Sequence, residues 1–126
     1  MANTPKTKAA PMEYHVDAEG KRLGRLASDI AVMLQGKKAT TYTPNQVGNT
    51  RVIVKNLKGL DLTPKKMEEK MYYRHTGYMG HLREFTLAQM WEKSPERVLR
   101  EAVRRMLPKN FLNAKRLANL IVVEEK

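Results

Sequence analysis

The feature that most constrains the fold is a stripe of apolar residues with helical spacing between residues 23 and 34. Its members recur at positions i, i+3, i+4, i+7, i+8 and i+11, namely Leu23, Leu26, Ala27, Ile30, Ala31 and Leu34. This spacing places their side chains on one face of a helix, and Gly36 stands where a left-handed C-cap is typical. Gly24 lowers the helix propensity near the start, which indicates close packing or the close approach of another backbone.

Short runs of strand-forming residues lie on both sides of this helix. Residues 14–17 predict one strand, and residues 51–55 give the strongest strand pattern, β-branched and apolar enough to be buried on both faces. Residues 60–63 are a candidate for another short strand, and residues 120–123 are expected to close the sheet. Strands that alternate with helices favour an α/β fold with a small, mainly parallel sheet.

The second half of the chain is mainly helical. A short helix is expected over residues 87–91, and Ser94, Pro95 and Glu96 form a strong helix start. Serine can cap a helix, proline suits its first position, and glutamate complements the positive end of the helix dipole. The apolar stripe over residues 98–107 predicts the buried face of this helix, and the proline that follows ends it.

The length of 126 residues fits one domain with its own hydrophobic core. We expect residues 1–12 to form a flexible polar arm, without the marks of a signal or transit peptide, and residues 13–126 to form the domain. The chain has no cysteine, which excludes disulfides, thiolate catalysis and Cys-based zinc sites. No apolar run approaches the roughly 20 residues of a membrane-spanning helix.

Basic residues outnumber acidic ones by 24 to 13, which gives a net charge of +11. Such an excess favours a polyanionic partner, which can be RNA, DNA or an anionic membrane surface. The charge is also clustered, since residues 93–116 hold eight lysines and arginines against two glutamates. A membrane-surface helix would carry Trp, Phe or a broad leucine face beside its cations, whereas a globular core would consume the apolar stripe of this segment. We therefore favour RNA over a membrane, and over a basic protein with no polyanionic partner.

Residues 71–83 have the composition of an RNA-contacting loop, with three tyrosines, two glycines, two histidines and two arginines. Aromatic rings stack on unpaired bases, arginine forks onto phosphates, and glycine lets a backbone approach a polyanion. Tyr72 and Tyr73 would point to opposite faces of a strand, so one of them is expected in the core. The predicted RNA contacts in this segment are Arg74, His75, Thr76, Tyr78 and His81.

The turn at residues 20–25 is a second candidate for phosphate binding. Lys21, Arg22 and Arg25 lie beside a helix start, which favours phosphate, although solvated surface charge explains the spacing equally well. The spacing lacks the Walker A and dinucleotide-binding patterns, which argues against a nucleotide-dependent enzyme.

The other cationic candidates follow the first helix or form a ridge near the end of the chain. Acidic residues are too few to pair the ridge arginines, so we expect the ridge to contact RNA backbone. These candidates are Lys37, Lys38, Arg97, Arg100, Arg104, Arg105, Lys109, Lys115 and Arg116.

His75 and His81 do not predict a metal site or a catalytic base. A metal ion needs further nitrogen, sulfur or carboxylate ligands at suitable spacing, and a base needs a nucleophile nearby. Because neither accompanies these histidines, we expect no metal, no cofactor, no small-molecule substrate and no enzymatic activity.

Several specific blocks follow one another between residues 13 and 117. The most specific are residues 75–78, His-Thr-Gly-Tyr, and 106–110, Met-Leu-Pro-Lys-Asn; the others lie at 17–18, 23–28, 36–38, 42–44, 52–56, 95–98 and 102–103. In this order they resemble bacterial large-subunit ribosomal protein L-thirteen. The resemblance implies an α/β/α core around a four-stranded parallel sheet, no enzymatic activity, and a structural role on large-subunit ribosomal RNA (rRNA) early in assembly.

The same resemblance implies a cytoplasmic, ribosome-bound protein that contacts rRNA and neighbouring large-subunit proteins and does not form homo-oligomers. The chain departs from the family pattern where glycine is usual, at His81, Arg105 and Asn113, and its C-terminus is short. Two alternatives remain open. One is a free RNA-binding regulator, for example of its own messenger, and the other is a small phosphate-handling enzyme that uses residues 20–25.

Overall fold

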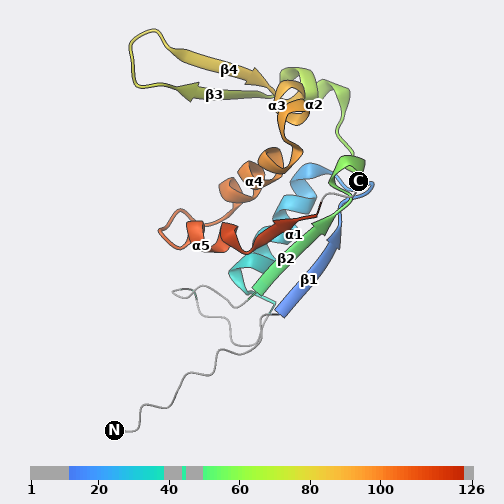
Figure 1. Ribbon diagram of the computed structural model, residues 1–126. Helices are drawn as coiled ribbons and strands as arrows, with labels where there is room; N and C mark the ends of the chain where they lie inside the picture. The colour runs from blue at the N-terminus through green and yellow to red at the C-terminus, as the bar shows by residue number, and fades with distance from the viewer. Residues whose placement is uncertain (1–11, 39–43, 45–49, 124–126) are drawn as a thin grey trace, which may run out of the picture.

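The computed structural model describes residues 12–38, 44 and 50–123 (Figure 1). The elements follow in the order β1 (Met12–Asp17), α1 (Leu23–Gln35), β2 (Thr50–Lys55), the 3-10 turn η1 (Leu57–Gly59), α2 (Pro64–Glu69), β3 (Met71–His75), β4 (Leu82–Thr86), α3 (Leu87–Lys93), α4 (Pro95–Met106), α5 (Asn113–Ala118) and β5 (Leu120–Val122). The α/β class is confirmed. The expected arm lies outside the described residues except for Met12, which belongs to β1, and a single domain over residues 13–126 stays a prediction.

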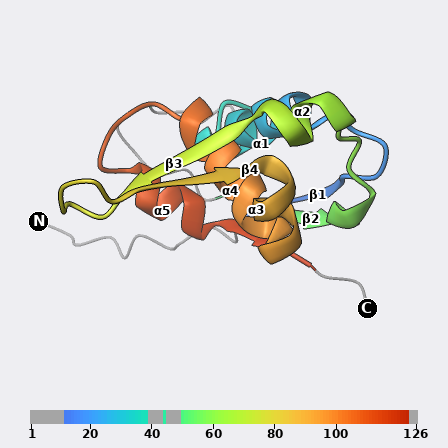
Figure 2. The same cartoon turned by 90° about the horizontal axis from the view of Figure 1, so that it is seen from above.

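The parallel sheet has the strand order β1-β2-β5, with Val52 of β2 paired to Tyr14 on one side and to Leu120 on the other. Along β2 the side chains alternate: Val52 and Val54 are buried, whereas Arg51 and Lys55 are exposed. The prediction that this strand is buried on both faces is therefore wrong. Two of its outward positions, Arg51 and Lys55, carry charges that favour water, Ile53 between them is half-buried, and the helices pack on the opposite face (Figures 1 and 2).

The expected fourth strand at residues 60–63 does not form. Asp61 makes only an isolated parallel bridge with Arg22, in which its N–H donates to the Lys21 carbonyl at 2.9 Å. The turn η1 precedes this segment, α2 begins directly after it at Pro64, and the segment between them makes no pairing beyond this single bridge. Over the described residues the parallel sheet thus has three strands with helices on one face, and neither the four-stranded sheet nor the third layer is confirmed.

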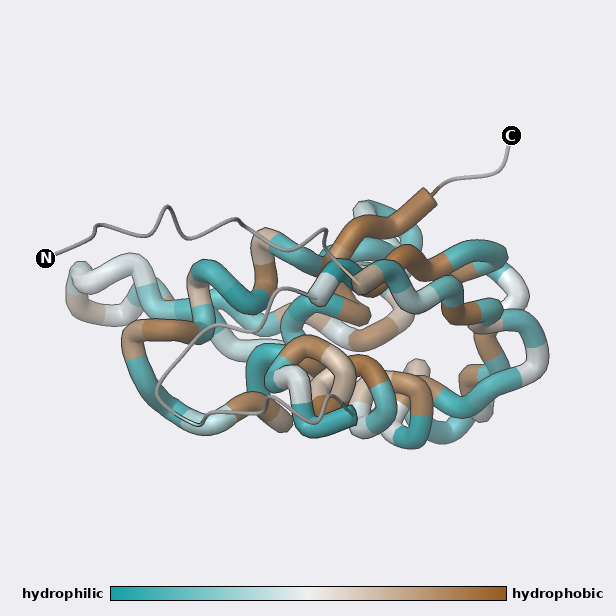
Figure 3. The backbone as a smooth tube through the Cα atoms, turned by 90° about the horizontal axis from the view of Figure 1, so that it is seen from below, coloured by the Kyte–Doolittle hydropathy of each residue, from teal (hydrophilic) through white to brown (hydrophobic). Residues whose placement is uncertain are grey.

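The core lies between the sheet, α1 and α4. All the predicted stripe residues of α1 are buried, and Gly36 closes this helix with φ +78° and an N–H bond to the Met33 carbonyl at 3.1 Å, as predicted. Among the apolar side chains with the least exposure are Leu26, Ile30, Leu34, Val52, Val54, Val98, Leu99, Val103 and Leu120. In Figure 3, β5 is a continuous hydrophobic stretch beside the C-terminal end of the trace.

Strands β3 and β4 form a separate antiparallel hairpin that extends away from the parallel sheet, above α4 (Figure 1). The split between neighbouring tyrosines is as predicted, since Tyr72 is 7% exposed and Tyr73 is 63% exposed. Helices α3 and α4 connect this hairpin to the core. α4 begins at Pro95 as predicted, although the Ser94 hydroxyl makes no capping hydrogen bond.

The junction between the hairpin and α3 depends on a capping box at Thr86. The Thr86 hydroxyl accepts from the Gln89 N–H at 3.3 Å, and the Gln89 side chain accepts from the Thr86 N–H at 3.1 Å. We expect Thr86→Ala to lower the free energy of unfolding by about 1 kcal/mol in urea denaturation. Thr63, the N-cap of α2, makes no such bond, so Thr63→Ala should change the free energy of unfolding far less. Equal losses in the two variants would contradict the assignment.

Candidate nucleic-acid interface

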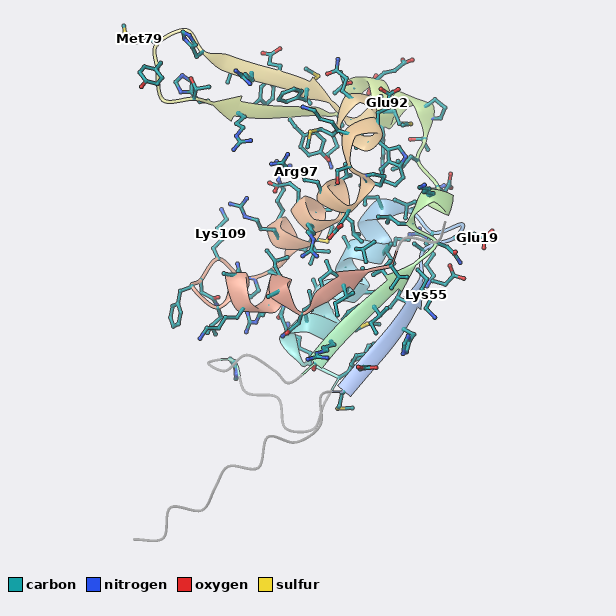
Figure 4. All side chains as sticks on the ribbon, in the orientation of Figure 1. Glu19, Lys55, Met79, Glu92, Arg97 and Lys109 are labelled. Carbon is teal, nitrogen blue, oxygen red and sulfur yellow. The ribbon has the colours of Figure 1, made fainter. Side chains whose placement is uncertain are left out.

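The tip of the β3–β4 hairpin is a tight loop with its own hydrogen bonds. Gly77 and Gly80 have φ values of +90° and +73°, which residues with a Cβ rarely adopt. The Thr76 N–H donates to the His81 carbonyl at 3.3 Å and closes the loop. The predicted contact Tyr78 is 75% exposed at this tip, beside Met79, which Figure 4 labels.

The two loop histidines are held in complementary tautomers by the backbone. Nδ1 of His75 accepts from the Gly77 N–H at 2.9 Å, so this nitrogen carries no proton. Nδ1 of His81 lies 2.8 Å from the Met79 carbonyl oxygen, which can only accept, so this nitrogen carries a proton. A neutral His75 thus leaves an Nε2–H donor and a neutral His81 leaves an Nε2 acceptor. In the described part of the chain, no three His, Cys, Asp or Glu side chains gather as metal ligands.

A groove of about 400 Å³ lies between the hairpin, α3 and α4. Strand alternation aims Tyr72, Arg74, Arg83 and Phe85 at the same side of the hairpin. Figure 4 shows Arg97 rising from α4 toward the hairpin. Among the described residues, six cations and one carboxylate, that of Glu101, line what we call the basic groove; the cations are Arg74, Arg83, Lys93, Arg97, Arg104 and Arg105.

Aromatic rings support several of these cations. The Lys93 ammonium lies 5.4 Å from the centre of the Phe85 ring, and the Arg105 guanidinium lies 5.6 Å from the centre of the Tyr72 ring. Burial raises the pKa of the Tyr72 phenol, Arg105 acts in the opposite direction, and Glu101 adds to the rise. Tyr72 therefore stays a neutral part of the groove wall.

Hairpin pairing also creates an unfavourable contact inside the basic groove. Arg74 and Arg83 are directly opposite each other in the antiparallel ladder, on the same face. Like charges in this position destabilise a hairpin unless an anion lies between or above them. Arg83, Lys93 and Phe85 were missed in the sequence, because only the register of the hairpin and its position over α3 bring them to the groove.

The ridge arginines on α4 differ from one another. Arg104 and Arg105 share Glu101 at 3.4 and 3.6 Å and remain largely exposed, so these pairs contribute little. Arg100 contacts Glu96 at 2.8 Å and also donates to the carbonyls of Leu117 and Leu120 at 3.0 and 2.9 Å. The expectation that acidic partners are too few is therefore wrong for both Arg100 and Arg104. Arg100 in addition joins α4 to α5 and β5.

Arg116 lies in the interior rather than on a contact surface. It is 2% exposed, and within the described residues its Nε and one terminal nitrogen have no hydrogen-bond partner. Helical periodicity did not show this, because α5 is short and packs against α4 and β5. In the described structure an RNA strand outside the protein could not reach this guanidinium.

The remaining predicted contacts are exposed and fall into separate groups. Lys109 lies in the loop that follows α4, and Lys115 lies in α5, with the exposed Phe111 between them in the sequence. Lys37 and Lys38 follow the end of α1, and the Lys38 ammonium lies 5.8 Å from the Tyr14 ring. A third group of predicted contacts lies at the start of α1, far in sequence from the residues of the basic groove. These are Lys21, Arg22 and Arg25.

No helix among the described residues has the length and apolar character required to cross a bilayer.

Comparison with known proteins gives one consistent answer. The sequence model of the family described as "Ribosomal protein L13" matches residues 12–126. The "Large ribosomal subunit protein uL13" of Chloroflexus aggregans is 50% identical over 107 residues, which cover 85% of this chain and 75% of the relative. Two further proteins of the same name are similar. The one from Clostridioides difficile is 47% identical over 109 residues, which cover 86% of this chain and 76% of the relative. The one from Thermotoga petrophila is 50% identical over 109 residues, which cover 86% of this chain and 73% of the relative. The chain therefore belongs to the ribosomal protein L13 family.

Proposed function

We propose that the chain is a structural, non-enzymatic constituent of the large ribosomal subunit in the cytoplasm. It binds large-subunit rRNA, helps that RNA to fold early in assembly, and contacts neighbouring ribosomal proteins as a single copy rather than a homo-oligomer. Its curated relatives carry the name of a large-subunit protein. The observation that carries the proposal in this chain is the Arg74–Arg83 pair within the basic groove.

The electrostatics of the basic groove favour a polyanion. An RNA backbone would relieve the repulsion between Arg74 and Arg83 and replace the counterions that otherwise screen the groove. Arginine suits this role because its planar guanidinium forks onto phosphate oxygens. Cations held on a rigid α/β support would then reduce the repulsion between packed RNA helices, which is how the protein would stabilise folded rRNA.

The hairpin tip would add contacts of a different kind. The outward Nε2–H of His75 suits a phosphate or carbonyl oxygen, and the outward Nε2 acceptor of His81 suits a ribose hydroxyl. The exposed ring of Tyr78 can stack on an unpaired base. Because most of these contacts go to backbone and ribose, specificity would come from the shape of the RNA more than from its base sequence.

Within the predicted set we retain the exposed residues as proposed RNA contacts. We assign the half-buried Arg100 to the junction of α4 with α5 and β5, and the buried Arg116 to the interior. The retained residues are Lys21, Arg22, Arg25, Lys37, Lys38, Arg74, His75, Thr76, Tyr78, His81, Arg97, Arg104, Arg105, Lys109 and Lys115.

The proposed function is tested by sedimentation of the tagged full chain from a cell lysate through a sucrose gradient. We expect the protein to migrate with large subunits and to remain there after a high-salt wash, as an integral component does. A protein that stays at the top of the gradient, or leaves the subunits at modest salt, would contradict the proposal and favour the free RNA-binding regulator.

A further inference from the structure

A second cavity, of about 310 Å³, lies between the start of α1, α2 and α4. We call it the α1–α4 pocket. Arg105 lines both this pocket and the basic groove, so the two are adjacent. The volume is at the lower end of the range for small-ligand sites, which matches a ligand of modest size.

The lining of the α1–α4 pocket combines positive charge with apolar surface. Four cations contribute to it, against the single carboxylate of Asp61; they are Arg22, Lys66, Lys70 and Arg105. The apolar part of the lining comes from Leu23, Leu62, Leu87, Ala102 and Met106. A ligand that fits this chemistry is therefore an anion that also carries a flat apolar group.

The cations of the α1–α4 pocket are held close together at an energetic cost. The pKa of Lys70 is lowered, first by burial and then by the charges of Arg105 and Lys66. The ammonium of Lys70 and the guanidinium of Arg105 also contact the same Tyr72 ring, at 5.5 and 5.6 Å from its centre. Glu101 pairs with Arg105 from outside the pocket lining, and among the described residues Asp61 is the one carboxylate in that lining. An anion between these side chains would remove repulsion that the protein alone does not neutralise.

The backbone at one wall of this pocket also lacks a negative partner. α1 has no acidic residue in its first turn, and Arg22, its N-cap, makes no side-chain capping bond. A Cβ built at Gly24, in that first turn, would meet no atom within 4 Å, so the approach to the backbone is open there. These features add to the cationic lining but would not define a site without it.

We propose that the α1–α4 pocket binds a nucleotide, with its phosphate among Arg22, Lys66, Lys70 and Arg105 and its base against the apolar lining. The nucleotide can be a free mononucleotide or one residue of an RNA strand turned out of its stack, because both offer the same chemistry. The pocket goes beyond the rRNA interface proposed above, which rests on the basic groove.

The test compares substitutions of two neighbouring lysines of α2, each made in the full-length protein. Lys66 lines the pocket and Lys65 does not, although both are exposed. We expect isothermal titration calorimetry at low salt to show saturable binding of adenosine monophosphate that inorganic phosphate competes away. Lys66→Gln should weaken this binding about tenfold, the effect of losing one charge-assisted contact, and Lys65→Gln should leave it unchanged. Adenosine without phosphate should bind far more weakly.

A second probe distinguishes the source of the nucleotide. If adenosine monophosphate does not bind but a short single-stranded oligoadenylate does, and Lys66→Gln weakens the binding of the oligoadenylate whereas Lys65→Gln does not, the ligand is a nucleotide within RNA. Arg105→Gln provides an independent variant with the same expected loss, and thermal unfolding checks that every variant is folded. If folded Lys66→Gln and Arg105→Gln bind both probes like the parent protein, the pocket is not a nucleotide site. That result would leave the sedimentation test of the ribosomal role unaffected.

Discussion

Replacing Arg74, Arg97 and Arg104 together with glutamate is expected to keep the protein out of large subunits and to lower its affinity for rRNA by about a hundredfold or more. All three side chains are exposed in the basic groove, and their reversal turns an attractive surface into one that repels phosphate. Filter binding to transcribed large-subunit rRNA at several salt concentrations measures the effect. The dependence of affinity on salt should also become shallower, because fewer counterions are released.

The control for this variant carries the same change in net charge elsewhere. Arg51, Lys55 and Lys58 are exposed cations outside the basic groove, and replacing them with glutamate should cost far less affinity. The free energy of unfolding of both triple variants should stay close to that of the parent protein. In the groove variant, Arg104 loses only a weak surface pair with Glu101. Normal incorporation of the groove variant into subunits would mean that rRNA binds another surface.

Arg100→Glu is expected to destabilise the fold itself, by about 3 kcal/mol. The substitution removes the donors to the carbonyls of Leu117 and Leu120, which lie at the end of α5 and the start of β5. It also places a new carboxylate beside Glu96 and those two carbonyl oxygens. Urea denaturation followed by circular dichroism measures the free energy of unfolding.

Arg97→Glu is the matched control for Arg100→Glu, since both residues lie on α4. Arg97 is exposed and makes no hydrogen bond or ion pair with another described residue, whereas Arg100 makes both. It should change the free energy of unfolding by no more than about 0.5 kcal/mol. If the two variants were equally stable and equally defective in RNA binding, Arg100 would be a surface contact after all.

The helices were predictable because their apolar spacing is local information. The stripe that ends before Gly36 describes a whole buried face of α1, and no tertiary contact has to be known to recognise it. The sheet was less predictable. Residues 60–63 have strand-like composition, but whether they extend a ladder depends on the turn before them and the helix after them. Which face of β2 is exposed likewise depends on the side of the sheet on which the helices pack. The pattern of β-branched residues does not encode that side.

The candidate interface divides in a similar way. Composition marked Arg74 and the hairpin tip as candidates; both are exposed in the structure, and their contact with RNA stays a prediction. The roles of Arg83 and Lys93 follow from strand register and from the position of the hairpin over α3. The bonds of Arg100 to backbone carbonyls and the burial of Arg116 both depend on segments that approach from other parts of the chain. No one-dimensional spacing reveals such neighbours.

The hydrogen bonds within the hairpin tip mean that this loop has its shape before any RNA arrives. His75 and His81 each hold a backbone group two residues away, and the loop backbone closes across Thr76. Ordering a free loop costs about 1–2 kcal/mol per residue in conformational entropy. Here that loss occurs during folding of the protein, so little of it falls on the encounter with RNA. In the proposed interface the tip would act as a preformed template, and the RNA would be the partner that adapts its conformation.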